Sequence, residues 1–243
     1  MIDVKNLKKS FGNFKAVDDV TFEVKAGEIF GLLGPNGAGK TTTLRMLSTI
    51  LKPDSGQIRV NGFEVSQEPD KVRTQLGVVA DSNALYDRLS ATENVRYFAR
   101  LYDMTEDKIK RRMDELFPKL GIDEFANKRA GQFSRGMKQK VSIASALMHD
   151  PPILIFDEPT NGLDVMAARQ VRQFIKECRR PDKCIIFSTH IMREVEELCD
   201  RIAIIDKGKV TAIGTFRELQ EQSGRRDLED IFVQLVEGDS RAL

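Results

Sequence analysis

The sequence has few cysteines, no long hydrophobic run and almost no excess of either charge. Its three cysteines are odd in number and lack the Cys-x-x-Cys spacing of zinc sites, which argues against a disulfide framework and favours a reducing compartment. The longest apolar runs, such as 153–156, are far shorter than the roughly 20 residues of a membrane span. With 38 Lys and Arg against 37 Asp and Glu the net charge is +1, so we expect no nucleic-acid partner.

The composition is otherwise that of a globular protein. At 243 residues, with 41% hydrophobic and 31% charged residues, the chain is long enough to bury a core in one or two domains. Residues 1–5 contain no apolar stretch of the kind found in a signal peptide. We therefore expect a soluble intracellular protein that remains able to dock onto a membrane protein.

The hydrophobic pattern predicts strands at both ends of the chain and helices between them. Residues 20–24 alternate apolar and polar side chains, which is typical of a strand with one buried face. From 90 to 148 apolar residues recur at helical spacing, and Ser90 with Glu93 forms a predicted capping box. The pattern predicts a parallel α/β core with an inserted helical region. Continuous apolar runs, typical of strands buried on both faces, occur at 153–156, 184–187 and 202–205.

A glycine-rich loop lies between a predicted strand at 28–33 and a predicted helix at 41–50. Residues 34–41, GPNGAGKT, match the phosphate-binding pattern GxxxxGK[ST] in that context. The glycines allow backbone N–H groups to surround a phosphate, and the helix N-terminus adds a positive dipole end. We expect Lys40 to reach the β- and γ-phosphates of a nucleotide and Thr41 to ligate Mg²⁺.

Two acidic residues follow the apolar run at 153–156. Asp157 and Glu158 then lie at the carboxyl end of a buried strand, where ligands of α/β sheets gather. We expect Asp157 to hold Mg²⁺ through water and Glu158 to face the attacking water as a general base. Alone, such a pair also fits two solvated loop acids, but the phosphate loop upstream favours the catalytic interpretation.

Three further segments carry a family resemblance. Residues 133–139, FSRGMKQ, are similar to the LSGGQ signature of ATP-binding cassette (ABC) ATPases. Residues 161–164, NGLD, and 188–190, STH, are similar to the D-loop and the switch-histidine segment of that family. With the phosphate loop and the acid pair, five motifs occur in the family's order between about Val4 and Gly214. The chain is therefore identified by resemblance as a member of this family.

The resemblance implies a fold and a division of the chain. The fold is α/β, a P-loop NTPase (RecA-like) core with an antiparallel β subdomain and an inserted α-helical subdomain. The core would comprise 1–80 and 150–220, including the N-terminal β subdomain. The helical subdomain with the signature would occupy 81–149, and a C-terminal helix and tail would follow at 221–243.

The signature suggests a second anion site on the same chain. Ser134 at a helix N-cap, with Gly136 just inside, offers a hydroxyl, free amides and a dipole end, although Ser134 alone also fits a simple cap. The resemblance implies a head-to-tail dimer in which each ATP lies between the Lys40 loop of one subunit and the Ser134 helix of its twin.

The resemblance also assigns roles to single residues. Lys40, Glu158 and His190 are the expected catalytic residues, with His190 contacting the γ-phosphate. Phe11 is expected to stack on adenine, but it also fits a core position near a strand end. The expected nucleotide-binding residues are Phe11, Gly34, Asn36, Gly37, Ala38, Gly39, Lys40, Thr41, Thr42, Ser134, Gly136 and Asp164.

One segment departs from the family pattern. Residues 77–82 occupy the Q-loop region but contain no glutamine, and Asp81 takes its place. The resemblance thus implies Thr41, Asp157 and Asp81 as metal ligands, although aspartate is shorter than glutamine and adds a charge, and the other role for this segment is a hinge between the core and the helical insertion. His149 matches no functional position and is expected in a surface loop.

The stretches 85–94 and 134–139 are similar to the ABC-2-type exporter branch, and within it to a sodium-efflux ATPase subunit. This implies an ATP-hydrolysing subunit that uses ATP and Mg²⁺ at the cytoplasmic face of the plasma membrane. Its partners would be a second copy, or a homologous ATPase subunit, and an integral membrane permease. A short helix of the permease would enter a groove beside 81–98, touching Tyr86, Leu89 and Tyr97, unless those three form local core.

Three other functions are considered. A soluble ABC ATPase of an assembly or repair machine shares these motifs, but neither a long coiled coil nor a second cassette is present. A P-loop GTPase would need a guanine-reading NKxD, and residues 127–130, NKRA, lack the acid. A non-enzymatic ATP-binding regulator would require an idle Glu158.

Overall fold

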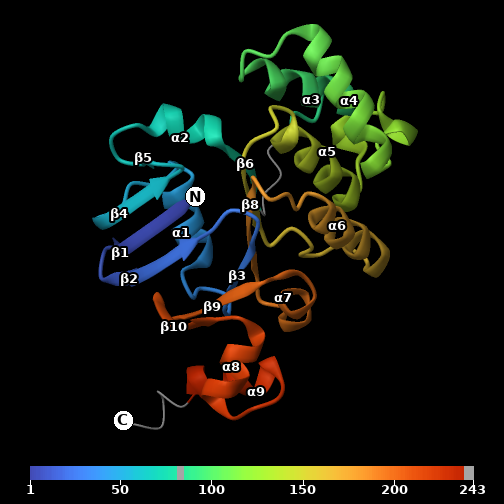
Figure 1. Cartoon of the computed structure of the whole chain (residues 1–243). Coiled ribbons are helices and arrows are strands. Elements are labelled where there is room, and N and C mark those ends of the chain that lie inside the picture. Colours follow the sequence, from blue (N-terminus) through green and yellow to red (C-terminus); the bar gives the residue numbers. More distant parts are fainter. Residues whose placement is uncertain (81–84, 238–243) are drawn as a thin grey trace.

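The computed structural model describes residues 1–80 and 85–237. In this part of the chain the centre is a six-stranded sheet in the order β10-β9-β3-β8-β7-β6 (Figure 1). The strands from β9 to β6 are parallel, whereas β10 at one edge pairs antiparallel with β9. The strands are β3 (Ile29–Leu33), β6 (Leu76–Val79), β7 (Ile153–Asp157), β8 (Cys184–Thr189), β9 (Arg201–Asp206) and β10 (Lys209–Gly214).

The central sheet is covered on both faces, and alternate side chains of its strands enter different clusters. In β7, Ile153 and Ile155 belong to one buried cluster, whereas Leu154 and Phe156 belong to another. None of the four is more than 1% exposed. The continuous apolar runs are therefore strands buried on both faces, and the predicted α/β fold class is confirmed.

A smaller antiparallel sheet, in the order β2-β1-β4-β5, lies beside the central one (Figure 1). Helix α1 (Lys40–Leu47) packs between the two sheets, because its Leu44 and Met46 share a buried cluster with Val4 of one sheet and Phe30 of the other. This packing fixes where α1 begins relative to both sheets. The strands are β1 (Ile2–Phe11), β2 (Phe14–Val24), β4 (Ser55–Val60) and β5 (Phe63–Glu64).

Helices α3, α4 and α5 form a group at one end of the molecule (Figure 1, green to yellow). The predicted capping box at the start of α3 is confirmed: Ser90 Oγ accepts from the Glu93 N–H, and the Glu93 carboxylate accepts from the Ser90 N–H. The buried faces of these helices join one apolar cluster with α6 and the central sheet. The helices are α2 (Pro69–Gln75), α3 (Ala91–Arg100), α4 (Glu106–Leu120), α5 (Arg135–Leu147) and α6 (Val165–Glu177).

The last helices are α7 (Met192–Leu198), α8 (Phe216–Ser223) and α9 (Leu228–Glu237). They share a buried cluster with Leu33 at the end of β3 and with Ile202 and Ile204 of β9. No helix in the described part of the chain has the length and hydrophobicity needed to cross a membrane. The division into 1–80 with 150–220, 81–149 and 221–243 stays a prediction.

Candidate functional site

The glycine-rich loop connects β3 to α1 along a path that requires glycine at two points. Gly39, the N-cap of α1, has φ 106°, and a Cβ there would lie 2.4 Å from the Ala16 carbonyl oxygen. A Cβ on Gly34 would lie 2.3 Å from the Ile205 carbonyl oxygen. The loop backbone therefore packs directly against β2 and β9. Because no side chain caps α1, its first N–H groups are available to a bound phosphate.

Lys40 joins this loop to the acid pair. Its side chain is 5% exposed, and Nζ donates to the carbonyl oxygens of Gly34 at 2.7 Å and Pro35 at 3.2 Å. Nζ also lies 3.2 Å from Glu158 Oε1 in a buried ion pair. The predicted phosphate-binding cation and the predicted base thus occupy one site.

The pairing of β7 with β8 places Asp157 opposite Ser188. Asp157 Oδ1 accepts hydrogen bonds from Ser188 Oγ at 2.5 Å and from Thr41 Oγ1 at 3.2 Å. No role was predicted for Ser188, although it lies in the switch segment. It anchors the Asp157 carboxylate beside Thr41, another of the three predicted metal ligands.

Glu158 has a left-handed backbone with φ 48°, an uncommon conformation for a residue with a side chain. Its N–H donates to the Ser188 carbonyl oxygen and to Ser188 Oγ, both at 3.1 Å, which holds this conformation. Its Oε2 lies 2.9 Å from His190 Nδ1. An ionised carboxylate only accepts hydrogen bonds, so Nδ1 carries the proton in this contact. The structure therefore brings Lys40, Glu158 and His190 together.

A cavity of about 250 Å³ adjoins the phosphate loop. Residues 35–42 line it together with Phe11, Phe14, Glu158 and Asn161. Phe11 and Phe14 pair across the turn between β1 and β2 and are 52% and 61% exposed, so Phe11 is not a core residue. Exposed aromatic rings beside a phosphate loop suit stacking on a base. The sequence analysis did not predict Phe14 as a nucleotide-binding residue. The observation that could have identified it is its position opposite Phe11 in the hairpin.

Ser134, Gly136 and Asp164, the predicted nucleotide-binding residues of the signature and D-loop, do not line this cavity, although Asn161 at the start of the D-loop does. Ser134 is exposed and caps α5 by accepting from the Met137 N–H at 3.2 Å. Asp164 caps α6 by accepting from the Ala167 N–H at 2.9 Å. A Cβ on Gly136 would lie 3.5 Å from the Ala167 Cβ. The two caps are therefore neighbours on one surface, and neither lines the cavity beside the Lys40 loop of the same chain.

The residues present fit a nucleoside triphosphate with Mg²⁺. A Cβ at Gly34 or Gly39 would collide with the backbone behind the loop, and the hydroxyl of Thr41 meets the carboxylate of Asp157. Hard oxygen donors of this kind suit Mg²⁺, which draws its other ligands from phosphate and water. Consistently, no cluster of three or more His, Cys, Asp and Glu suited to a metal occurs among the described residues. Asp81, the third predicted metal ligand, lies outside the described residues.

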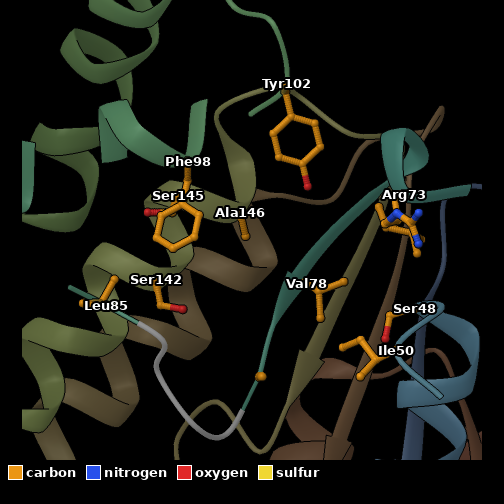
Figure 2. Close-up of a pocket in the computed structure, with 12 residues that line it drawn as sticks. Ser48, Ile50, Arg73, Val78, Leu85, Phe98, Tyr102, Ser142, Ser145 and Ala146 are labelled. Carbon is orange, nitrogen blue, oxygen red and sulfur yellow. The ribbon is translucent and has the colours of Figure 1, made fainter. Parts of the chain in front are cut away.

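A second cavity, of about 260 Å³, lies between the helical group and the core (Figure 2). Phe98, Ser142 and Ala146 line it from α3 and α5, and Val78 and Arg73 line it from β6 and α2. Its lining is mostly apolar. We call it the interdomain groove.

His149 lies in a turn, as predicted, but it is half-buried rather than a freely exposed surface residue. Its ring stacks on Tyr102 with centroids 3.7 Å apart, and its Nε2 lies 3.1 Å from the Leu76 carbonyl oxygen. Burial lowers the pKa of His149 to about 4, because the charged ring is desolvated there. The ring thus fills the joint between α5 and β6 as a neutral group.

A phosphate loop after a parallel strand and an acid pair at the end of a nearby strand define a P-loop nucleotide hydrolase. The family model described as "ABC transporter" matches residues 17–161. NatA, an ABC transporter ATP-binding protein of Bacillus subtilis (strain 168), is 46% identical over 228 residues, which cover 93% of each chain. This chain belongs to the ABC transporter family and is an ATP hydrolase.

Solved structures agree with this assignment. An ATP-binding subunit of an ABC transporter superimposes with a TM-score of 0.89 at 33% identity, covering 97% of this chain and 99% of the other. The cassette MJ0796, in a dimeric post-hydrolysis state bound to ADP and Pi, gives a TM-score of 0.81 at 28% identity, with 88% and 98% coverage. The predicted ABC family and P-loop NTPase fold are confirmed.

Proposed function

We propose that this chain is the ATPase subunit of an exporter, and that two copies close head-to-tail around two ATP molecules. The observation that carries this proposal is the separation of the two predicted phosphate sites. Lys40 and Glu158 line one cavity, while Ser134 and Asp164 lie outside it on exposed helix starts. A second chain can bring its Ser134 helix to the open side of the cavity, and a relative, the cassette MJ0796, is dimeric in a post-hydrolysis state bound to ADP and Pi.

Each catalytic residue receives a role from its contacts. Lys40 holds the β- and γ-phosphates, and Glu158, fixed between Lys40 and His190, accepts a proton from the attacking water. With Nδ1 donating to Glu158, the Nε2 of His190 donates to the γ-phosphate only when the ring is protonated. Thr41 and Asp157 would hold Mg²⁺, which supplies charge neutralisation on the phosphates.

The proposed membrane partner is an integral permease that receives the motion of closure. The interdomain groove supports this, since it lies at the joint between the helical group and the core. Near it, Tyr86 and Tyr97 are 49% and 40% exposed and contact each other edge to face. An exposed aromatic pair beside an apolar groove suits a short amphipathic helix. The subunit would then act at the cytoplasmic face of the plasma membrane.

Co-purification with a membrane protein tests this partner. We expect wild-type protein to capture one integral membrane protein from solubilised membranes, and Tyr97→Glu to lose it while keeping ATP binding. Val233→Glu on α9 is the matched control, because Val233 is similarly exposed at 42%. Equal capture by both variants would contradict the groove as docking site, and capture of a soluble assembly factor alone would favour the machine interpretation.

The proposed cargo is sodium, in line with the sequence resemblance to a sodium-efflux subunit. The permease chooses the cargo, so the test requires the full complex in vesicles. We expect ATP-dependent movement of ²²Na⁺ that stops with Lys40→Ala in this subunit. ATP turnover without sodium movement would leave the ATPase role standing and remove sodium as cargo.

A further inference from the structure

Glu194 on α7 is a buried carboxylate for which the chemistry above has no role. The residue is 3% exposed. Its Oε2 accepts hydrogen bonds from Thr160 Oγ1 at 2.9 Å and from Thr189 Oγ1 at 3.0 Å, and its Oε1 pairs with Arg172 Nη1 at 3.2 Å. A buried charge is costly unless it is paired and hydrogen-bonded, and here both oxygens have partners.

The two hydroxyl donors come from the segments that carry the catalytic pair. Thr160 lies two residues after Glu158, and Thr189 immediately precedes His190. Thr189 Oγ1 also accepts from the Ile191 N–H at 3.1 Å. The same hydroxyl therefore ties the backbone on both sides of His190 to Glu194.

The cationic partner comes from the helix that follows the D-loop. Arg172 lies on α6, which begins at Asp164, and its Nε also donates to Glu197 Oε2 at 3.0 Å. Lys176 Nζ lies 3.0 Å from Glu197 Oε1. These pairs fasten α7, and with it Glu194, to α6.

We propose that Glu194 is a positioning residue that sets the distance between Glu158 and His190 and links both to the D-loop helix. The proposal rests on the catalytic roles proposed for that pair. Glu194 Oε2 holds both the segment that carries Glu158 and the segment that carries His190. Glu194 Oε1 connects these two segments to α6 through Arg172. When the network is intact, Glu158 and His190 stay at the 2.9 Å contact in which the base is oriented.

The experiment removes one hydroxyl without changing the shape of the side chain. Thr189→Val deletes the hydroxyl that donates to Glu194. Thr211→Val is the control. Thr211 Oγ1 donates to the Ile204 carbonyl oxygen on β9, and neither Glu158 nor His190 is its partner. We expect Thr189→Val to lower kcat roughly 10-fold, as loss of supporting hydrogen bonds typically does, with the KM for ATP changed by less than about twofold. Thr211→Val should keep the wild-type kcat.

A double-mutant cycle supplies the readout that a purely structural role would not produce. We expect Thr189→Val to have little further effect on kcat in a His190→Ala background, because the residue that it positions is gone. Full additivity, an unchanged kcat in Thr189→Val, or equal losses in Thr189→Val and Thr211→Val would each overturn the proposal. Glu194→Gln should lower kcat in the same direction as Thr189→Val.

The outcome is separable from the proposed function. If Glu158→Gln retains wild-type turnover, the base assignment fails whatever Thr189→Val does. If Glu158→Gln is inactive while Thr189→Val matches Thr211→Val, only the positioning role of Glu194 fails.

Discussion

The N-termini of α1 and α5 are both predicted to face phosphate, but they are built differently. Helix α1 begins at Gly39 without a side-chain cap, next to Lys40 in its ion pair with Glu158. The N-cap of α5 is the exposed Ser134, whose Oγ accepts from the Met137 N–H and whose hydroxyl can also act as a donor.

This difference between the two helix ends indicates that each end has its own role in ATP hydrolysis. The α1 end has Lys40 and its ion-pair partner Glu158, the proposed cation and base of the reaction. The first turn of α5 contains no acidic residue, so this end can stabilise a phosphate through hydrogen-bond donors and its dipole but offers no carboxylate to act as a base. In the proposed head-to-tail dimer, each chain holds two unequal halves of a site, and the two halves that meet come from different molecules.

Lys40→Ala breaks the α1 half and should have the largest effect. It removes the phosphate-binding cation and leaves Glu158 without its ionic partner, so we expect phosphate release to fall to background. Lys5→Ala, at an exposed lysine, should hydrolyse ATP normally. Wild-type hydrolysis by Lys40→Ala would show that the phosphate cradle lies elsewhere.

Glu158→Gln separates binding from chemistry within the same half. The amide keeps the shape of the side chain but accepts a proton poorly, so we expect turnover to fall by about 10²–10⁴-fold. ATP should remain bound, as measured by equilibrium binding of a fluorescent ATP analogue. An unchanged rate means that the base is another residue.

Ser134→Arg tests the α5 half. A long cation at the exposed cap should block closure, which lowers turnover by roughly 10²-fold through loss of phosphate contacts in the second half. The affinity of a single subunit for ATP should stay the same, because Ser134 does not line the cavity. Ser66→Arg, at another exposed serine, is the control. Equal ATPase rates in the two variants would remove the signature from the active site.

Phe11→Ala should have the smallest effect, on affinity alone. Loss of one stacked ring costs about 1 kcal/mol, or roughly fivefold in the dissociation constant for ATP. Turnover at saturating ATP should be unchanged, and Leu101→Ala, at an exposed apolar residue, should change neither quantity. If Phe14→Ala weakens ATP binding and Phe11→Ala does not, the base stacks on the other ring of the hairpin.

Much of this site is predictable from the sequence because its motifs are contiguous. The phosphate loop from 34 to 41 carries its own backbone requirements, and Asp157 and Glu158 follow a recognisable buried strand. The sequence does not show which strands are neighbours. Ser188 therefore emerged as the partner of Asp157 only with the pairing of β7 and β8.

The same limit explains the misplacement of His149. Next to Asp150 and Pro151 it looks like an exposed loop residue, and it does lie in a turn, but Tyr102 and Leu76, 47 and 73 positions away, cover part of its ring. Glu194 was missed for a related reason, since its three partners come from three separate segments.

The most direct test is the mass of Glu158→Gln in solution with Mg²⁺ and ATP, measured by analytical ultracentrifugation. If each ATP lies between the Lys40 loop of one subunit and the Ser134 helix of the other, we expect a stable dimer with two bound ATP molecules. The double variant that also carries Ser134→Arg should be a monomer. A nucleotide-loaded Glu158→Gln protein that stays monomeric, alone and in complex with its permease, would contradict the shared site.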